Sequence, residues 1–137
     1  RLRSEKDFQD IQLVLIGGTP EKEVLSLPGL HHFKRPTDDA LATLYKYASV
    51  FSYPSWAEGY GLPLQEAARF KTPCITSSGS TLEETAPIGT LFIPPEKPHL
   101  LAEALRMQLL KPQPTHLRSA ESVPAGAKLL SILRKTK

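Results

Sequence analysis

Two glutamates with seven residues between them, Glu58 and Glu66, enclose a glycine-containing stretch of the chain. A carboxylate one turn into a helix, as expected for Glu66, can accept two hydrogen bonds from a ribose diol. A carboxylate in the preceding loop, as expected for Glu58, would lie nearer to a sugar joined to that nucleotide. The glycines let the backbone approach a ligand because they carry no side chain. On spacing alone the pair fits an exposed loop acid and a solvated helix residue better than a nucleotide-sugar site, and both readings stay open at this point.

A strand and a helix must position these two carboxylates. Residues 50–53 are mostly β-branched or aromatic and stop at a proline, which predicts a buried strand. A helix is predicted to begin near Pro63, because the fixed φ of proline suits a first helical position. The loop is then a strand-to-helix crossing at the carboxyl end of a parallel strand, where open α/β sheets bind ligands. We expect the amides of Gly61, Leu62 and Leu64 to face outward there and to suit a phosphate.

The rest of the chain alternates apolar runs with amphipathic segments. The apolar runs predict strands over 11–16, 30–33, 74–76 and 90–93, and the strand over 11–16 is expected to be central and covered on both faces. Helices are predicted after an N-cap at Thr37, after a capping box over 80–83, and from about Pro98 to 110. This order predicts an α/β fold with a doubly wound parallel sheet.

Glycines and histidines near the first two predicted strands suggest further sites. Gly17 and Gly18 end the first strand, but neither a third glycine nor a clear helix start follows, so the dinucleotide fingerprint is absent. A ligand contact and a plain turn both remain open for this pair. His31 and His32 are adjacent, so in a strand they point to opposite faces and cannot share a metal.

Composition narrows the class of protein. The chain has 137 residues, 40% hydrophobic and 23% charged, which fits one soluble globular domain. The net charge is +3, with basic residues gathered in 134–137 and no basic stripe interleaved with aromatics, so no nucleic-acid partner is predicted. Cys74 is the single cysteine, which excludes an internal disulfide and favours a reducing, cytoplasmic setting. No apolar run approaches the roughly 20 residues of a membrane span. The charged run over 1–10 is interpreted as the end of a helix that begins outside this chain.

The residues around the two glutamates resemble a known family. The stretch FSYPSWAEGYGLPLQEAARFKTPCITSSGSTLEE is similar to the C-terminal-domain signature of the retaining GT-B glycosyltransferases of the GT4 type. That signature runs F-x-x-P-S-x-x-E-G-[FY]-G-L-P-x-x-E-A, then a loop and P-V-I-x-S. The resemblance also includes LVLIGG, DDALATLYKYASVF and residues 94–105, and it covers roughly residues 11 to 110. The residues that match the two-glutamate motif are Glu58, Gly59, Tyr60, Gly61, Leu62, Pro63 and Glu66.

The resemblance implies a Rossmann-like fold and an enzyme. Residues 1–137 would be the donor-binding part of a two-domain hexosyltransferase. Outside the resemblance, the helical apolar pattern near the C-terminus predicts a helical tail over 111–137. The enzyme would transfer a sugar, with retention of configuration, from a UDP- or GDP-sugar to an acceptor glycan or lipid. It would need no metal or other cofactor, and this chain alone would be inactive without the N-terminal acceptor-binding domain. Because many acceptors in the family are lipids, peripheral membrane association stays open. The alternatives are a non-catalytic nucleotide-binding or regulatory module and an epimerase of similar fold.

The resemblance also implies a role for each matching residue. Glu66 would hold the donor ribose, and Glu58 would contact the donor sugar as the catalytic carboxylate. The basic pair that neutralises the diphosphate in the family lies upstream of this chain, and Gln65 is a mild departure from the pattern. The base, the sugar and the acceptor do not follow from the sequence. The further donor-binding candidates are Gly59, Tyr60, Gly61 and Leu62 for the sugar and phosphates, Lys34 and Arg35 near the base, and Gly17 and Ser80 in neighbouring loops.

Overall fold

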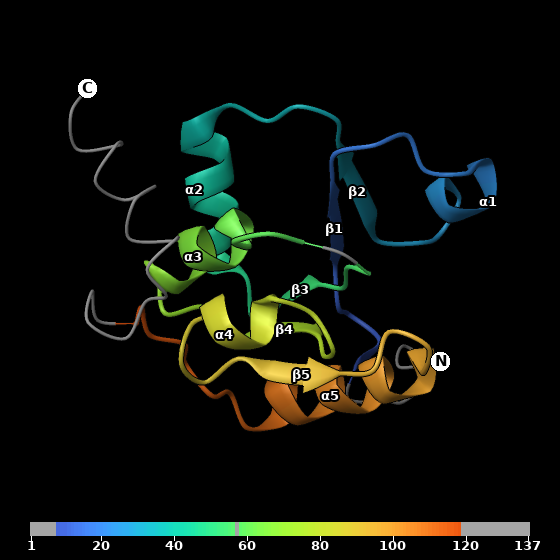
Figure 1. Ribbon diagram of the computed structural model, residues 1–137. Coiled ribbons are helices and arrows are strands. Elements are labelled where there is room, and N and C mark those ends of the chain that lie inside the picture. The colour runs from blue at the N-terminus through green and yellow to red at the C-terminus, as the bar shows by residue number, and fades with distance from the viewer. Residues whose placement is uncertain (1–7, 57, 119–137) are drawn as a thin grey trace. The chain divides into compact units, whose positions relative to one another are not determined.

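The computed structural model describes residues 8–56 and 58–118, which belong to two compact units that adjoin in sequence between Leu41 and Ala42 (Figure 1). The first unit contains strand β1 (Leu13–Ile16), the one-turn helix α1 (Lys22–Leu25) and strand β2 (Leu30–Phe33). The two strands are parallel, with Leu13 opposite Leu30 and Ile16 opposite Phe33. The prediction of two parallel strands here is confirmed.

Two features of the first unit differ from the sequence-based expectation. Helix α1 was not expected. Its N-cap residue is Glu21, which is not a typical capping residue and makes no side-chain capping bond. Strand β1 is not covered on both faces, since the side chains of Leu13, Val14 and Ile16 are exposed. The physical reason within this unit is that α1 has four residues and none of them is buried, so it cannot cover the pair of strands.

Helix α2 (Asp38–Tyr47) runs across the boundary between the units and begins as predicted. The hydroxyl of Thr37 accepts a hydrogen bond from the amide of Ala40 at 3.3 Å, and two aspartates occupy the first turn. Tyr45 is the buried residue of this helix. The predicted cap is confirmed, and the side chain of Tyr45 faces the core.

The second unit contains a three-stranded parallel sheet with helices between its strands. Strands β3 (Phe51–Tyr53), β4 (Cys74–Ser77) and β5 (Leu91–Ile93) pair in the order β3-β4-β5, with all pairs parallel. Helix α3 (Leu62–Ala68) connects β3 to β4, the short helix α4 (Leu82–Thr85) connects β4 to β5, and helix α5 (Pro98–Leu110) follows β5. The predicted alternation and the parallel direction of the strands are confirmed.

The core of the second unit is built around β4, whose four residues are all buried. Ile75 of β4 and Ile93 of β5 pack with Ala104 of α5. Helix α3 contacts β3 and β4, and Figure 1 shows it on the opposite side of these strands from α5. Leu100, Leu101 and Leu105 of α5 pack against the same cluster, so the apolar side of this helix faces the sheet. β4 therefore lies between α3 and α5, and its buried carboxyl end can anchor the loops that surround it.

Residues 111–118, where the predicted C-terminal helical tail begins, are extended rather than helical. Ile88 and His116 form an isolated antiparallel bridge, and the buried hydroxyl of Thr115 donates to the carbonyl of Thr72 at 2.6 Å. The thiol of Cys74 lies beside Thr115, and burial raises the pKa of this thiol to about 11, so it stays neutral. The remainder of the predicted tail, 119–137, lies outside the described residues. So do residues 1–7 of the run over 1–10 that was interpreted as a helix end, and residues 8–10 of that run form a turn.

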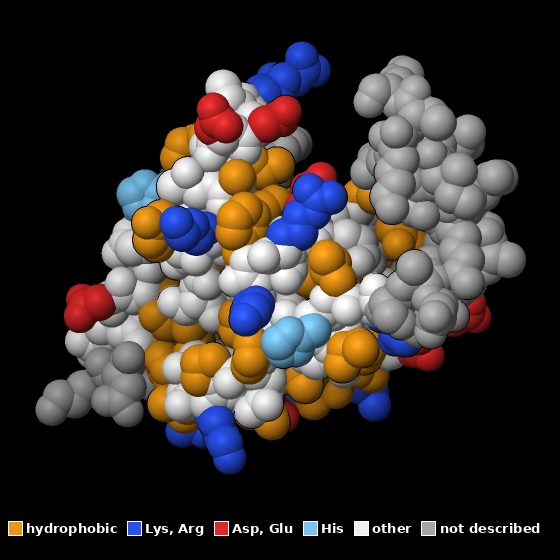
Figure 2. All heavy atoms as spheres, turned by 90° about the vertical axis from the view of Figure 1, so that its left-hand side faces the viewer, with side chains coloured by type: hydrophobic (Ala, Val, Ile, Leu, Met, Phe, Trp, Pro, Cys, Tyr) orange, Lys and Arg blue, Asp and Glu red, His pale blue; other side chains and the backbone are white. Residues whose placement is uncertain are grey.

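On the face shown in Figure 2, the described lysines and arginines lie singly among apolar and polar side chains. Among residues 8–56 and 58–118, no helix combines the length and the apolar character needed to cross a membrane.

Candidate functional site

The loop between β3 and α3 is tied to the carboxyl end of β4. The amide of Ser55 donates to the hydroxyl of Ser77 at 2.9 Å, and the hydroxyl of Thr76 donates to the carbonyl of Tyr53 at 2.8 Å. Both partners belong to the buried strand β4, so the start of the loop is fixed to the most rigid part of the unit. The loop therefore leaves the carboxyl edge of the parallel sheet, as predicted.

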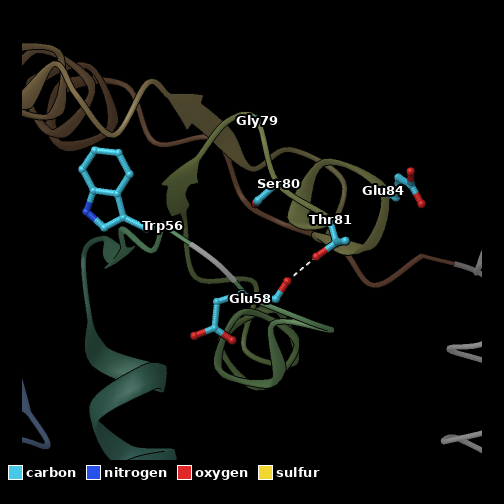
Figure 3. A pocket seen from close by; sticks show the side chains of 6 residues that line it. All are labelled: Trp56, Glu58, Gly79, Ser80, Thr81 and Glu84. Atoms are coloured by element: carbon cyan, nitrogen blue, oxygen red, sulfur yellow. Dashed lines mark hydrogen bonds between the residues drawn. The ribbon is translucent and has the colours of Figure 1, made fainter.

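The far end of the same loop is held by the start of α4. The hydroxyl of Thr81 donates to the backbone carbonyl of Glu58 and lies 2.9 Å from the carbonyl of Gly59 (Figure 3). The capping box predicted over 80–83 does not form, and the N-cap residue of α4 is Thr81, which makes no side-chain capping bond. The hydroxyl of Ser80 accepts from the amide of Leu82 at 3.3 Å, and the carboxylate of Glu83 accepts from Gly79 at 2.7 Å rather than from Ser80.

Replacing Thr81 by valine is expected to lower the free energy of unfolding by about 1 kcal/mol, the net value of one such hydrogen bond. Valine keeps the shape of the side chain and removes the hydroxyl that holds the two loop carbonyls. Urea unfolding of the variant measures the change, with the exposed Thr19→Val substitution as the control. Equal stability of Thr81→Val and the unmodified protein would show that this contact does not hold the loop.

Glu58 is half-buried in this loop and is held by the last residue of β3. The phenol of Tyr53 donates to Oε1 of Glu58 at 2.5 Å, and the hydroxyl of Ser55 lies 3.5 Å from the same oxygen. Burial, with the hydrogen bond to Glu58 and the charge of that carboxylate, raises the pKa of Tyr53 to about 12. The phenol therefore keeps its proton at neutral pH and acts as a donor to Glu58.

Glu66 projects from α3 toward α2 and is held in a similar way. The phenol of Tyr45 donates to Oε2 of Glu66 at 3.4 Å. Burial raises the pKa of Tyr45, and the neighbouring charge of Glu66 raises it further, so this phenol also stays protonated. The carbonyl of Tyr45 accepts a hydrogen bond from the buried Thr72 at 2.7 Å, which anchors the residue.

The two tyrosines belong to one series of aromatic rings. Tyr45 meets Phe51 edge to face, with ring centroids 5.1 Å apart and planes at 85°. Phe51 stacks on Tyr53 at 6.0 Å and 17°. The chain of contacts therefore runs from one candidate carboxylate to the other through three rings. The sequence pattern gave no sign of this arrangement, because Tyr45 and Tyr53 fit the core positions of a helix and a strand.

The turn into α3 requires glycine at position 61. Gly61 is the N-cap of α3 and has φ of +68°, and a Cβ there would lie 2.5 Å from Cδ2 of the buried Leu82. One expectation for this turn is wrong: the amide of Leu64 does not face outward but donates to the carbonyl of Gly61 at 3.0 Å. It is used by the first turn of the helix itself. The amides of Gly61 and Leu62 have no acceptor among the described residues.

A hollow of about 420 Å³ opens beside this loop (Figure 3). Glu58 and Ser80, both predicted site residues, lie on its wall with Thr81. Trp56 also lines it and is 73% exposed; the sequence analysis did not single out this residue, whose only signal is its place two residues before Glu58. In Figure 3 the side chain of Glu84 points away from Thr81. The structure thus brings Glu58 and Ser80 to one hollow, and Glu66 is not part of its lining.

Gly17, Lys34 and Arg35 belong to the first unit. Gly17 has φ of +87°, donates from its amide to the carbonyl of Phe33 at 3.0 Å, and accepts from Nε2 of His32 at 2.8 Å. Lys34 and Arg35 are exposed and follow directly after β2, so all three lie at the carboxyl ends of the paired strands β1 and β2. Among the described residues, no group of three or more His, Cys, Asp or Glu side chains is arranged to hold a metal.

The family of glycosyl transferases group 1 matches residues 1–122 of this chain. The chain belongs to that family. The resemblance found around Glu58 and Glu66 is thereby confirmed at the level of the family, and with it the glycosyltransferase class of this domain. The group 1 match covers every described helix and strand, from β1 through α5.

Relatives of this group 1 domain are larger proteins. Two curated sequences of the serotype-specific mannosyltransferase WbdA from Escherichia coli are each 36% identical over 84 residues, which make up 61% of this chain and 10% of the relative. The solved structure of sucrose-phosphate synthase from Thermosynechococcus elongatus matches with a TM-score of 0.60 and 28% identity over 74% of this chain and 30% of that chain. This likeness confirms the α/β, GT-B type of fold. The chain spans about a tenth of the curated relatives.

Proposed function

We propose that this domain binds the donor of a retaining glycosyl transfer, a UDP- or GDP-sugar whose hexose passes to a glycan or lipid acceptor. The observation that carries the proposal is the pair Glu58 and Glu66. Each carboxylate accepts a hydrogen bond from a protonated tyrosine, and the pair encloses the Gly61 turn at the carboxyl edge of a parallel sheet. Sheets of this kind bind nucleotides at that edge.

In this proposal Glu66 accepts hydrogen bonds from the two ribose hydroxyls, and Glu58 accepts from a hydroxyl of the transferred sugar. The diphosphate lies against the amides of Gly61 and Leu62, which have no acceptor among the described residues. The rate of the full enzyme then comes from positioning the donor and stabilising the charge of the departing diphosphate. The remaining donor contacts are assigned to Gly59, Tyr60, Gly17 and Ser80, and those near the base to Lys34 and Arg35.

The acceptor site is assigned to an N-terminal partner domain in the same protein. We place the reaction in the cytoplasm, at the membrane surface where the acceptor is a lipid. No metal or other cofactor takes part in the proposed step, so a chelator is expected to leave transfer unchanged. Because the curated relatives are named as mannosyltransferases, mannosyl donors come first among the sugars to test.

The test is donor binding and product analysis with the full-length protein. Calorimetric titration with a panel of UDP- and GDP-sugars is expected to give saturable binding of at least one donor. Incubation with acceptors should release free nucleotide and a new glycoside, whose anomeric configuration by NMR should equal that of the donor. Failure to bind any nucleotide sugar would favour a regulatory module of the same fold, and an inverted anomeric centre would contradict the retaining mechanism.

A further inference from the structure

We propose that Tyr53 and Tyr45 are positioning residues that act on different parts of the donor, the first through Glu58 and the second through Glu66. Tyr53 orients Glu58 for the transferred sugar, and Tyr45 orients Glu66 for the ribose. This inference rests on the proposed function and deepens it, because it assigns the two parts of the donor to two different phenol–carboxylate pairs.

The contact between Tyr53 and Glu58 is the stronger of the two. The phenol oxygen lies 2.5 Å from Oε1 of Glu58, a separation typical of a hydrogen bond from a hydroxyl to a carboxylate. Tyr53 is the last residue of β3, and its backbone carbonyl is bonded to Thr76 of the buried central strand. The Tyr53 phenol is thus held by the sheet, whereas the Glu58 carboxylate that it contacts lies in a loop. Both described contacts of the carboxylate involve Oε1, so Oε2 of Glu58 can accept a hydrogen bond from a ligand.

The contact between Tyr45 and Glu66 is longer, at 3.4 Å, and involves Oε2. Tyr45 is 6% exposed and is anchored through its carbonyl by Thr72, so its ring has little freedom to move. Glu66 lies on α3, where the helix already fixes its backbone. The phenol therefore selects a rotamer of Glu66 rather than a loop position, and we expect a smaller effect of removing it.

Phe51 connects the two phenols, since its ring contacts Tyr45 edge to face and Tyr53 by stacking. Both arrangements are favoured geometries of aromatic pairs. The series fixes the two phenols relative to one another and, through them, the two carboxylates. The ribose and the sugar of a donor are joined through a flexible diphosphate, so carboxylates held at a fixed spacing favour one conformation of that linker.

The effects of Tyr53 and Tyr45 can be measured separately, because a free nucleoside diphosphate has the ribose but lacks the transferred sugar. In the full-length protein, Tyr53→Phe is expected to raise the Kd of the nucleotide sugar about tenfold, as for the loss of one hydrogen bond to a charged group. The Kd of the free nucleoside diphosphate should not change. Tyr45→Phe should raise the Kd of the nucleotide sugar and the Kd of the free diphosphate by the same factor, about threefold to tenfold.

The matched control is Tyr47→Phe, which removes the hydroxyl of a tyrosine that is 75% exposed on α2. It should change neither Kd. As a second measurement, adding Tyr53→Phe to Glu58→Gln should have no further effect on sugar binding, because coupled residues are not additive. Additive effects in this cycle would overturn the inference. So would a Tyr53→Phe protein that keeps the affinity of the original for the nucleotide sugar, or one that loses affinity for the free diphosphate equally. A wild-type protein that binds the free diphosphate but no nucleotide sugar would overturn the proposed function and the inference with it.

Discussion

Replacing Glu66 by alanine is expected to raise the Kd of nucleotide sugars and of free nucleoside diphosphates by about 100-fold or more. A carboxylate that accepts two hydrogen bonds from the ribose diol loses both, and bonds to charged groups are each worth about 1.5–3 kcal/mol. The substitution also removes the acceptor of the Tyr45 phenol, which stays protonated and is left without its partner. Both changes act on the nucleoside end of the donor, so the Kd of the nucleotide sugar and the Kd of the free nucleoside diphosphate should rise by the same factor.

Calorimetric titration of the full-length protein measures this change, and circular dichroism confirms that the variant is folded. The matched control is Glu103→Ala, which removes an exposed carboxylate from α5. It should leave both affinities as they are. Unchanged nucleotide affinity in Glu66→Ala would show that this glutamate is a solvated helix residue, the alternative that its spacing alone left open.

Replacing Gly61 by alanine is expected to lower the free energy of unfolding by about 2–4 kcal/mol. An L-residue at φ of +68° costs about 1 kcal/mol relative to glycine. The new Cβ would also lie 2.5 Å from Cδ2 of Leu82, which is fully buried and cannot move without displacing its neighbours. Forcing a methyl group into such a packed site costs about 1–3 kcal/mol more.

Urea unfolding of this chain measures the loss, and Gly59→Ala is the control from the same loop. A Cβ at position 59 would meet no atom within 4 Å, and its backbone is not in the left-handed region. This control should change stability by well under 1 kcal/mol. Equal stability of Gly61→Ala and Gly59→Ala would contradict the close packing of α3 against α4 that places the turn.

The order of elements in the second unit followed from the sequence because its signals are local. Prolines stop β3 and open α3 and α5, and the apolar runs between them have the lengths of buried strands. The first unit was harder to predict. Its apolar run over 11–16 has the composition of a covered strand, and sequence composition cannot show that the neighbouring helix α1 is too short to cover it.

The candidate site was predicted in its carboxylates but not in what holds them. Glu58 and Glu66 were singled out by their spacing around a glycine-containing stretch and by the match to the family signature. Tyr45 and Tyr53 were missed because their rings satisfy that pattern, and only the folded chain shows where each hydroxyl points. The amide of Leu64 was wrongly expected to face a ligand, since the first turn of α3 closes on Gly61 one residue earlier than the proline indicated.

The most direct test of the central claim is a crystal structure of the full-length protein with its nucleotide sugar bound. We predict that the ribose hydroxyls lie within hydrogen-bond distance of the Glu66 carboxylate and that a sugar hydroxyl lies within that distance of Glu58. A nucleotide sugar bound with its ribose and hexose away from both carboxylates would contradict the account.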